Sequence, residues 1–506
     1  MLKRQHLIAG DWLDGSATFE NQPIDGAPET FQAGNPDLVE RACEAAEAAF
    51  ESYSATSGAQ RAAFLRRIGR EIEARGAEIT EIGMRETGLP EARLNGERGR
   101  TVAQLGLFAD HVEAGKHLDL RHDAALPERQ PLPRPELRMM QRPIGPVAVF
   151  GASNFPLAFS SAGGDTAAAL AAGCPVVVKG HSAHPGVADI VAQAVDAARQ
   201  SEGLHRGVFS QIQGGNRAVG EALVRHPLIR AVGFTGSLAG GRALFDLCAR
   251  RPDPIPFFGE LGSINPVFVM PRALAARGGE IASGWAASLL MGAGQFCTNP
   301  GVVVLPAGDR AESFIDAAQE ALDAAPDQPM LTPGIAAAFR AAREAMVANG
   351  RAETRIARES DPRHAAPALF VTRAADWLAD TTLHEEAFGP LGVVVLARDV
   401  DEMQAVARGL EGQLTATLQI EEEDAEATAP LLRTLERKAG RVLANGFPTG
   451  VEVADAMVHG GPYPASTNFG ATSVGTLSIR RFLRPVCFQN IPAALLPAEM
   501  RGAPRP

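Results

Sequence analysis

The 506-residue sequence predicts an α/β fold in which parallel strands are covered by helices and the chain divides into two or three lobes. Short apolar segments alternate with helical patterns from residue 147 to residue 250, an order typical of a parallel sheet with helices on both faces. A second series of apolar segments and helices follows residue 265. The chain is also too long for one simple core, which favours more than one lobe.

The N-terminal part predicts a hairpin followed by four helices. Ile8 and Trp12 mark the edge of the hairpin. Apolar residues then recur at helical spacing in segments 38–50, 60–74, 77–86 and 94–111. Residues 120–136 are rich in proline and charge, which predicts an irregular crossing segment before the alternating pattern begins.

The alternating pattern supplies the strands and helices of the first sheet. Strands are predicted at 147–150, 175–179, 208–212 and 229–234, and helices at 166–172, 187–199, 217–225 and 238–250. The second lobe is predicted to hold strands at 265–270, 301–305 and 391–396 and helices at 311–324 and 335–348. A last strand at 482–489 ends exposed unless another subunit covers it. Because open sheet edges invite pairing, this strand predicts a homodimer or homotetramer.

Composition argues against several classes of function. Lysine and arginine number 48 against 59 acidic residues, a net charge of −11 without a basic run, so no nucleic-acid partner is expected. The 11 histidines show no clustered ligand spacing, so no metal is expected. Five scattered cysteines favour a reducing cytoplasm, and residues 1–6 lead into the chain without an apolar leader segment. The longest apolar run, 167–178, is short and interrupted, so no membrane span is expected.

Three glycine-containing turns carry reactive side chains. Cys297 follows such a turn after an apolar segment, where a thiolate nucleophile has room for a substrate. Glu260 stands between two glycines with apolar flanks, which predicts a raised pKa suited to a general base. Asn154 directly follows a predicted strand, where its amide NH₂ faces a developing oxyanion. A lone free cysteine is more often a small buried hydrophobe, but three such turns together favour a reactive site.

Together these segments resemble the NAD(P)-dependent aldehyde dehydrogenase superfamily, from residues 8–12 to residues 481–486. The resemblance implies a Rossmann-type cofactor domain at 1–121 and 143–258, an α/β catalytic domain at 259–478, a small β oligomerisation flap at 122–142 and 479–492, and a C-terminal tail at 493–506. It also implies oxidation of an aldehyde to a carboxylic acid. The Cys297 thiolate would attack the carbonyl, Asn154 and the Cys297 backbone N–H would hold the oxyanion, and Glu260 would activate water to hydrolyse the thioester.

The resemblance places the pyrophosphate of NAD or NADP at the turn that contains Gly236, Ser237 and Gly241, where a helix begins with free N–H groups. It places the nicotinamide ribose at Glu386, with Phe388 packed beside the ring. Each feature also has a plain structural interpretation. A glycine turn commonly closes a strand–helix connection, and an acid pair can stabilise a helix terminus.

The adenosine end of the cofactor is expected at Lys179, with His181 or His184 as a further hydrogen-bond donor. Ser182 stands where strictly NAD-linked members of the family commonly place a glutamate that binds the ribose hydroxyls. Since the repulsive carboxylate is missing, NADP is favoured over NAD. Ser182 could alternatively cap the helix that follows it.

The substrate prediction depends on a narrower resemblance. Residues 179–185, 459–466 and 481–490 look like the branch that includes 2,5-dioxovalerate (α-ketoglutarate semialdehyde) dehydrogenases, although NADP-linked long-chain aldehyde enzymes resemble this branch too. Arg98 and Arg100 lie on a helix that borders the substrate tunnel in the family and would pair with a substrate carboxylate, or else with Glu97. Phe155 and Phe296 are further candidate substrate contacts.

Two other functions remain open on the sequence alone. A reductase that transfers acyl groups would keep the cysteine but need no deacylating base, so Glu260 argues against it. A non-catalytic binding or structural protein on the same fold could lose Cys297 or Glu260, yet both are present.

Overall fold

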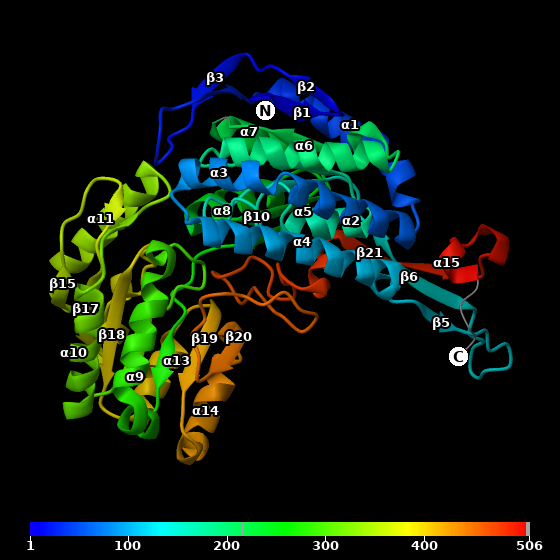
Figure 1. Cartoon of the computed structure of the whole chain (residues 1–506). Coiled ribbons are helices and arrows are strands. Elements are labelled where there is room, and N and C mark those ends of the chain that lie inside the picture. The colour runs from blue at the N-terminus through cyan, green and yellow to red at the C-terminus, as the bar shows by residue number, and fades with distance from the viewer. Residues whose placement is uncertain (215, 502–506) are drawn as a thin grey trace.

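The computed structural model describes residues 1–214 and 216–501, which form two seven-stranded sheets, one three-stranded sheet and two two-stranded ribbons. Figure 1 shows the N-terminal lobe above and beside a second lobe, with the three-stranded sheet projecting from the body. The α/β fold with parallel sheets is confirmed. None of the helices in these residues is both long and apolar enough to cross a membrane.

The first sheet has the strand order β11-β10-β7-β8-β9-β1-β2. Its parallel strands are β7 (Val147–Phe150), β8 (Val176–Lys179), β9 (Phe209–Ile212), β10 (Ala231–Thr235) and β11 (Phe257–Glu260). The antiparallel hairpin of β1 (His6–Ile8) and β2 (Asp11–Leu13) extends one edge, as predicted.

Alternate residues of each strand face different cores, since successive side chains of a strand point to opposite faces. Val147 and Val149 pack with α2 (Gly58–Ala74), α4 (Glu91–Glu113), α5 (Gly164–Ala172) and α6 (Pro185–Ser201). Ala148 and Phe150 pack with α1 (Pro36–Ser54), α7 (Arg217–Arg225) and α8 (Leu238–Ala249). The helix α3 (Gly76–Thr87) and the ribbon of β3 (Ala17–Glu20) and β4 (Thr30–Ala33) complete this part of the chain.

The second sheet has the strand order β15-β17-β18-β13-β12-β19-β20. It comprises β12 (Val267–Val269), β13 (Val302–Pro306), β15 (Glu353–Ala357), β17 (Ala368–Arg373), β18 (Leu391–Ala397), β19 (Gln413–Gln419) and β20 (Ala439–Ala444). Its pairs are parallel except for β15 with β17. The accompanying elements are α9 (Pro271–Leu290), α10 (Asp309–Asp323), α11 (Pro333–Ala348), α12 (Ala374–Ala379), α13 (Val400–Gly409), α14 (Ala425–Leu435) and the ribbon of β14 (Gln328–Pro329) with β16 (His364–Ala365).

The projecting sheet pairs β6 (Leu137–Pro143) with β5 (Arg121–Asp123) on one side and β21 (Leu483–Gln489) on the other, all antiparallel. The short helix α15 (Ala498–Arg501) lies near its end (Figure 1). The sheet contains the segments predicted for the flap. Its role in oligomerisation and the predicted domain boundaries stay predictions.

The carboxyl ends of the first sheet's strands define the edge where the site lies. Lys179, Phe150, Phe234 and Gly259 are in register and form one row across four strands, and Glu260 follows Gly259 in register with Thr235. Ser466 forms an antiparallel bridge with Glu260, which brings the C-terminal segment across this edge. Ligands of open α/β sheets bind at such an edge.

Candidate active site

Cys297 is positioned by a tight turn after α9. Gly292, Ala293 and Gly294 have φ values of 58°, 56° and 67°, a left-handed run that reverses the chain. A Cβ on Gly294 would lie 2.2 Å from the carbonyl carbon of Gly389, so glycine is required there. Asn299 Nδ2 also donates to the Gly389 oxygen at 3.2 Å. The turn therefore places Cys297, which is mostly buried, against the segment before β18.

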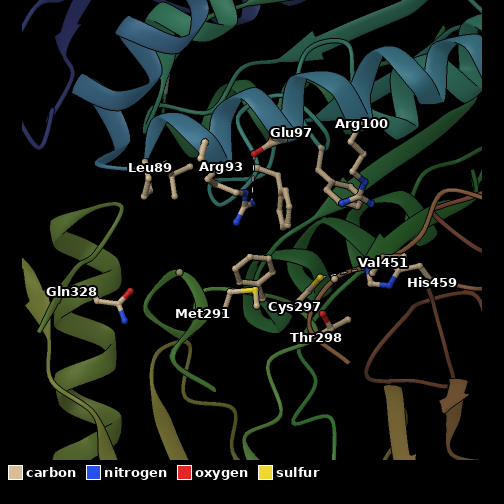
Figure 2. A pocket seen from close by; sticks show the side chains of 18 residues that line it. Leu89, Arg93, Glu97, Arg100, Met291, Cys297, Thr298, Gln328, Val451 and His459 are labelled. Carbon is tan, nitrogen blue, oxygen red and sulfur yellow. Dashed lines mark hydrogen bonds and ion pairs between the residues drawn. The ribbon is translucent and has the colours of Figure 1, made fainter. Parts of the chain in front are cut away.

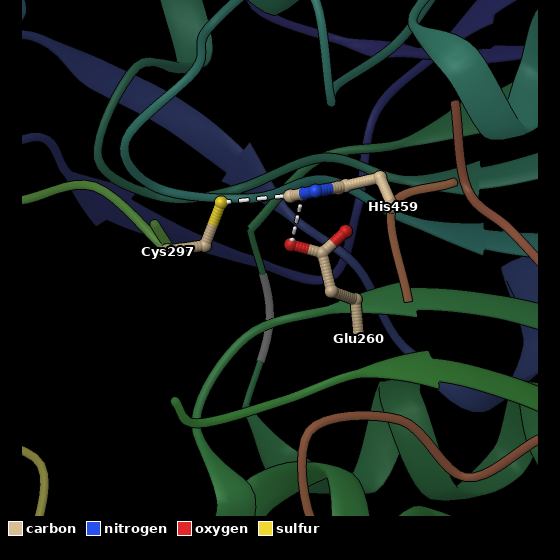
Figure 3. Close-up of side chains that lie close together, drawn as sticks. All are labelled: Glu260, Cys297 and His459. Atoms are coloured by element: carbon tan, nitrogen blue, oxygen red, sulfur yellow. Dashed lines mark hydrogen bonds and ion pairs between the residues drawn. The ribbon is translucent and has the colours of Figure 1, made fainter. Parts of the chain in front are cut away.

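Glu260 is the last residue of β11 and is buried. Ser473 Oγ donates to its Oε2 at 2.7 Å, and His459 Nε2 lies 2.8 Å from its Oε1. The same His459 nitrogen lies 3.4 Å from Cys297 Sγ, and Figure 3 shows the imidazole between the thiol and the carboxylate. Since both contacts use one ring nitrogen, a single proton can be shared among the three groups.

His459 was missed as a site residue by the sequence interpretation, which used its segment as a marker of a family branch. The histidine belongs to a loop that is fixed by backbone hydrogen bonds, with Thr472 Oγ1 accepting its N–H at 2.8 Å and its carbonyl accepting from the Ser473 N–H at 2.8 Å. Cys297, His459 and Glu260 lie close enough together to be considered as metal ligands, but the contacts among them are also explained by hydrogen bonds. The expected absence of a metal stays a prediction.

The predicted raised pKa of Glu260 is wrong. Burial raises the pKa, but the electrostatic effect of the adjacent His459 and hydrogen bonds from His459, Ser473 and Cys297 outweigh it and hold the pKa below its ordinary value. The apolar neighbours were visible in the sequence, whereas the donors come from a distant loop. Burial, reinforced by the Glu260 charge, raises the pKa of Cys297 well above its ordinary value, and Arg100 opposes this. The thiol therefore carries its proton at neutral pH.

Asn154 lies just beyond β7 and is buried. Its Nδ2 donates to the carbonyl oxygen of Gln295 at 3.0 Å, two residues before Cys297. The fold thus brings the amide to the segment that carries the thiol. Its action on an oxyanion remains a prediction.

A cavity of about 560 Å³ lies beside Cys297 and His459 (Figure 2). Phe155 and Phe296 both line it, with ring centroids 5.5 Å apart and ring planes nearly perpendicular at 89°. Of the two arginines predicted to contact the substrate, Arg100 lines the cavity, but Arg98 does not.

The prediction of Arg98 as a substrate contact is therefore wrong. Its guanidinium bonds to Gly76 O, Thr80 Oγ1 and Asn95 Oδ1, away from the cavity. Residues three, four and seven apart share one face of a helix, which gives α4 a cavity face made by Arg93, Glu97 and Arg100. Arg93 was missed because the predicted helix began at residue 94.

The turn between β10 and α8 has the geometry of an anion cradle. Ser237 is the N-cap of α8 and accepts from the Gly240 N–H, while the first turn of the helix is exposed. A Cβ on Gly241 would lie 2.1 Å from Leu261 Cδ2, and one on Gly236 would lie 2.8 Å from Phe234 Cζ. A side chain at either glycine would have to displace Leu261 or Phe234, and the free N–H groups of the helix start suit a phosphate.

Lys179, His181 and Ser182 follow one another at the end of β8. Lys179 is half-buried and burial lowers its pKa, His181 Nδ1 accepts from the Ala183 N–H, and Ser182 is exposed. The N-cap of α6 is His184 rather than Ser182, so the capping interpretation of Ser182 is wrong. His184 is fully buried and contacts the Ala152 carbonyl oxygen at 2.8 Å, which excludes it as an additional cofactor donor.

Glu386 and Phe388 line a narrow cleft that also includes Phe296 and Ser263. A Cβ on Gly262 would lie 2.7 Å from Glu386 Oε2, so this carboxylate reaches the loop after Glu260. The acid pair follows the short helical turn Thr381–His384 instead of opening a helix. Stabilisation of a helix N-terminus therefore does not explain the pair.

Comparison with known proteins agrees with this geometry. Residues 19–478, which include every site residue above, match the model of the Aldehyde dehydrogenase family. The chain is 52% identical to Alpha-ketoglutaric semialdehyde dehydrogenase 2 of Azospirillum brasilense, covering 99% of this chain and 97% of the relative. It is 48% identical to Alpha-ketoglutaric semialdehyde dehydrogenase of Acinetobacter baylyi, covering 93% and 90%.

Solved structures share the fold at low sequence identity. Betaine aldehyde dehydrogenase of Staphylococcus aureus, solved with NAD⁺, superposes with a TM-score of 0.83 at 20% identity, covering 96% of this chain and 95% of that one. An NADP-dependent enzyme of E. coli superposes with a TM-score of 0.81 at 24% identity, covering 96% and 98%.

Proposed function

Because the chain belongs to the aldehyde dehydrogenase family and is an aldehyde oxidoreductase, we propose that it oxidises α-ketoglutarate semialdehyde (2,5-dioxopentanoate) to 2-oxoglutarate with NADP or NAD. The names of the two relatives at 52% and 48% identity support the substrate. One observation carries the chemistry: a thiol and a carboxylate both contact one imidazole nitrogen beside a cavity.

Cys297 is the nucleophile in this proposal. Its raised pKa means that the proton must leave as the sulfur attacks the aldehyde carbon. His459 Nε2, 3.4 Å from Sγ, accepts that proton. Glu260, 2.8 Å from the same nitrogen, stabilises the imidazolium that forms.

Attack turns the carbonyl oxygen into an oxyanion, which the Asn154 amide and the Cys297 backbone N–H hold. Asn154 Nδ2 carries two hydrogens and gives one to Gln295 O, leaving the other for the oxyanion. When bound, NAD(P)⁺ supplies the acceptor for the hydride that the tetrahedral carbon loses. Cys297 is then left as a thioester.

Hydrolysis of the thioester requires a base for water. Glu260 is ionised at neutral pH, because His459 and Ser473 lower its pKa despite burial. His459 still carries the proton that it took from Cys297, so Glu260 accepts the proton of the attacking water and His459 returns its own proton to the Cys297 thiolate when the thioester breaks. The acid product then leaves and the thiol regains its proton.

The residues of the sheet edge fit a dinucleotide. Gly236, Ser237 and Gly241 suit the pyrophosphate through the exposed start of α8. Glu386 and Phe388 line the cleft assigned to the nicotinamide ribose and ring.

The adenosine ribose is assigned to the end of β8. Ser182 is exposed there beside Lys179 and His181, and Lys179 adds positive charge. A 2′-phosphate meets a hydroxyl and an ammonium at this position instead of a carboxylate. We therefore assign NADP use at least equal to NAD use.

Subunit pairing and compartment are further parts of the proposal. Among the described residues, β21 is one of the two outer strands of its sheet, which supports pairing with another copy in a homodimer or homotetramer. All five cysteines are free, which supports a cytoplasmic location.

A substrate panel tests the function. α-Ketoglutarate semialdehyde, pentanal and hexanal are assayed with NADP and with NAD, without coenzyme A. The highest kcat/KM is expected for α-ketoglutarate semialdehyde, with free 2-oxoglutarate as product. A higher kcat/KM for hexanal would instead establish the fatty-aldehyde alternative.

A further inference from the structure

Two arginines of α4, Arg93 and Arg100, form a charged wall of the cavity. Both line it, and Figure 2 shows them pointing from the helix toward the side where Cys297 lies. They are seven residues apart, which puts them on one helix face two turns from each other. Arg98, between them in the sequence, is bonded elsewhere to Gly76 and Thr80.

Arg93 is held in place by two aromatic rings and by polar contacts that are long. Its guanidinium carbon lies 4.5 Å and 4.6 Å from the ring centroids of Phe155 and Phe296. Glu97 Oε2 lies 3.5 Å from Arg93 Nη2, longer than the roughly 2.7–2.9 Å of a charge-assisted hydrogen bond. Arg93 Nη2 also donates to the Asn154 carbonyl oxygen at 3.5 Å, so the aromatic rings and two long polar contacts orient the guanidinium.

Glu97 itself is fixed by the backbone. Its Oε1 accepts the N–H groups of Leu157 at 2.8 Å and Ala158 at 2.9 Å, and its side chain is 1% exposed. The carboxylate therefore cannot swing to meet a guanidinium more closely. It stays a fixed anchor between the two arginines.

Arg100 carries donors that the rest of the protein leaves unused. Its Nε and Nη2 are buried and have no hydrogen-bond partner within residues 1–214 and 216–501. Its guanidinium carbon lies 5.8 Å from the Phe155 centroid and 5.3 Å from the Phe159 centroid. Leaving a buried donor unsatisfied costs about 1–3 kcal/mol, which a bound acceptor removes.

The charges and shape of this wall suit one carboxylate. Arg93 and Arg100 supply two positive charges against at most one negative charge at Glu97, whose pKa is raised by burial, so the wall has at least one positive charge in excess. Phe155 faces both guanidiniums and offers an apolar surface to a short carbon chain.

We propose that Arg93 and Arg100 together bind the carboxylate at the far end of the substrate and thereby select aldehydes that carry such a group. The inference rests on the proposed function and assigns its specificity to these two side chains. Guanidinium groups bind a carboxylate through paired hydrogen bonds, which fixes its orientation as well as its position. Anchoring the remote end holds the aldehyde carbon near Cys297.

The test uses the variants Arg93→Met and Arg100→Met, with Arg98→Met as the control on the same helix. The measured quantity is the ratio of kcat/KM for α-ketoglutarate semialdehyde to that for pentanal, a five-carbon aldehyde without the carboxylate. Each cavity variant should lower the ratio about 10- to 150-fold, the range that corresponds to losing hydrogen bonds to a charged group. Arg98→Met should leave the ratio unchanged.

The ratio is chosen because Arg100 has a second effect. It opposes the raised pKa of Cys297, so its removal slows the reaction of both aldehydes. This common loss cancels in the ratio. Competitive inhibition by 2-oxoglutarate gives a readout independent of the thiol chemistry, and its Ki should rise by a similar factor in both cavity variants.

The outcomes separate the two proposals. A wild-type enzyme that prefers pentanal would overturn the proposed substrate and the arginine assignment with it. A wild-type preference for the keto acid that survives in both cavity variants, with an unchanged Ki for 2-oxoglutarate, would overturn the arginine assignment alone. If the methionine variants do not fold, Arg93→Lys and Arg100→Lys keep the charge but lose the paired geometry, and an undiminished ratio in them would equally overturn the arginine assignment.

Discussion

Replacing His459 with glutamine removes the imidazole between the thiol and the carboxylate (Figure 3). A thiolate at Cys297 would then form opposite an unshielded Glu260 carboxylate, with the two atoms within 4.8 Å of each other. Two unit charges at that separation repel by about 3.5 kcal/mol at an effective dielectric constant of about 20. This energy corresponds to a loss of thiolate of roughly 300- to 400-fold.

The assay is the rate of alkylation of Cys297 by iodoacetamide as a function of pH, since alkylation follows the thiolate and needs neither substrate nor coenzyme. Cys487 is exposed, so the measurements use a Cys487→Ser background. The His459→Gln variant should react a few hundredfold more slowly at pH 7, and its rate should rise at higher pH than that of the parent.

A double variant isolates the charge effect. Glu260→Gln in addition to His459→Gln removes the repulsion and should restore most of the lost rate. A single variant that reacts at the parent rate, or a double variant as slow as the single one, would refute the electrostatic argument.

Three further substitutions test the proposed roles. Cys297→Ser should abolish aldehyde oxidation, because a serine hydroxyl is a far weaker nucleophile at neutral pH; substantial steady-state turnover would exclude Cys297 as the nucleophile. Glu260→Gln should release one equivalent of reduced coenzyme in a pre-steady-state burst and then stall as a thioester, whereas near-normal turnover would remove Glu260 from hydrolysis. Ser182→Glu should raise KM for NADP selectively, because a carboxylate repels the 2′-phosphate, and equal weakening of NADP and NAD would contradict this assignment.

The strands β7, β8, β9 and β10 of the first sheet were predictable because they are short, largely apolar runs, whereas no strand was predicted at β11. Val176, Val177 and Val178 illustrate the pattern, since neighbouring residues enter different cores. The strand β19 escaped prediction because its alternate residues are polar and yet buried. The side-chain oxygen of Gln413, for example, accepts hydrogen bonds from the backbone N–H groups of Ile264 and Asn265. The local sequence does not reveal these distant partners.

The site was predictable in part for a similar reason. Cys297 and Glu260 stand in recognisable glycine turns, but His459 lies 162 residues beyond Cys297 and reaches it because the C-terminal segment crosses β11. The lowered pKa of Glu260 depends on that crossing. Arg98 and Arg100 are two positions apart and therefore lie on different faces of α4. Which face lines the cavity depends on how α4 packs against the rest of the lobe.

The contact between Gly294 and Gly389 links the binding affinities of two neighbouring sites. The segment with Cys297 touches the segment that carries Glu386 and Phe388, and Asn299 bonds across the join. A ligand that displaces either segment must therefore disturb this contact. Under the proposed assignment of coenzyme to Glu386, coupling through this contact makes coenzyme and any reversible thiol ligand reciprocal effectors, each changing the other's affinity by the same factor. The reactivity of one sulfur atom then reports how fully the coenzyme site is occupied.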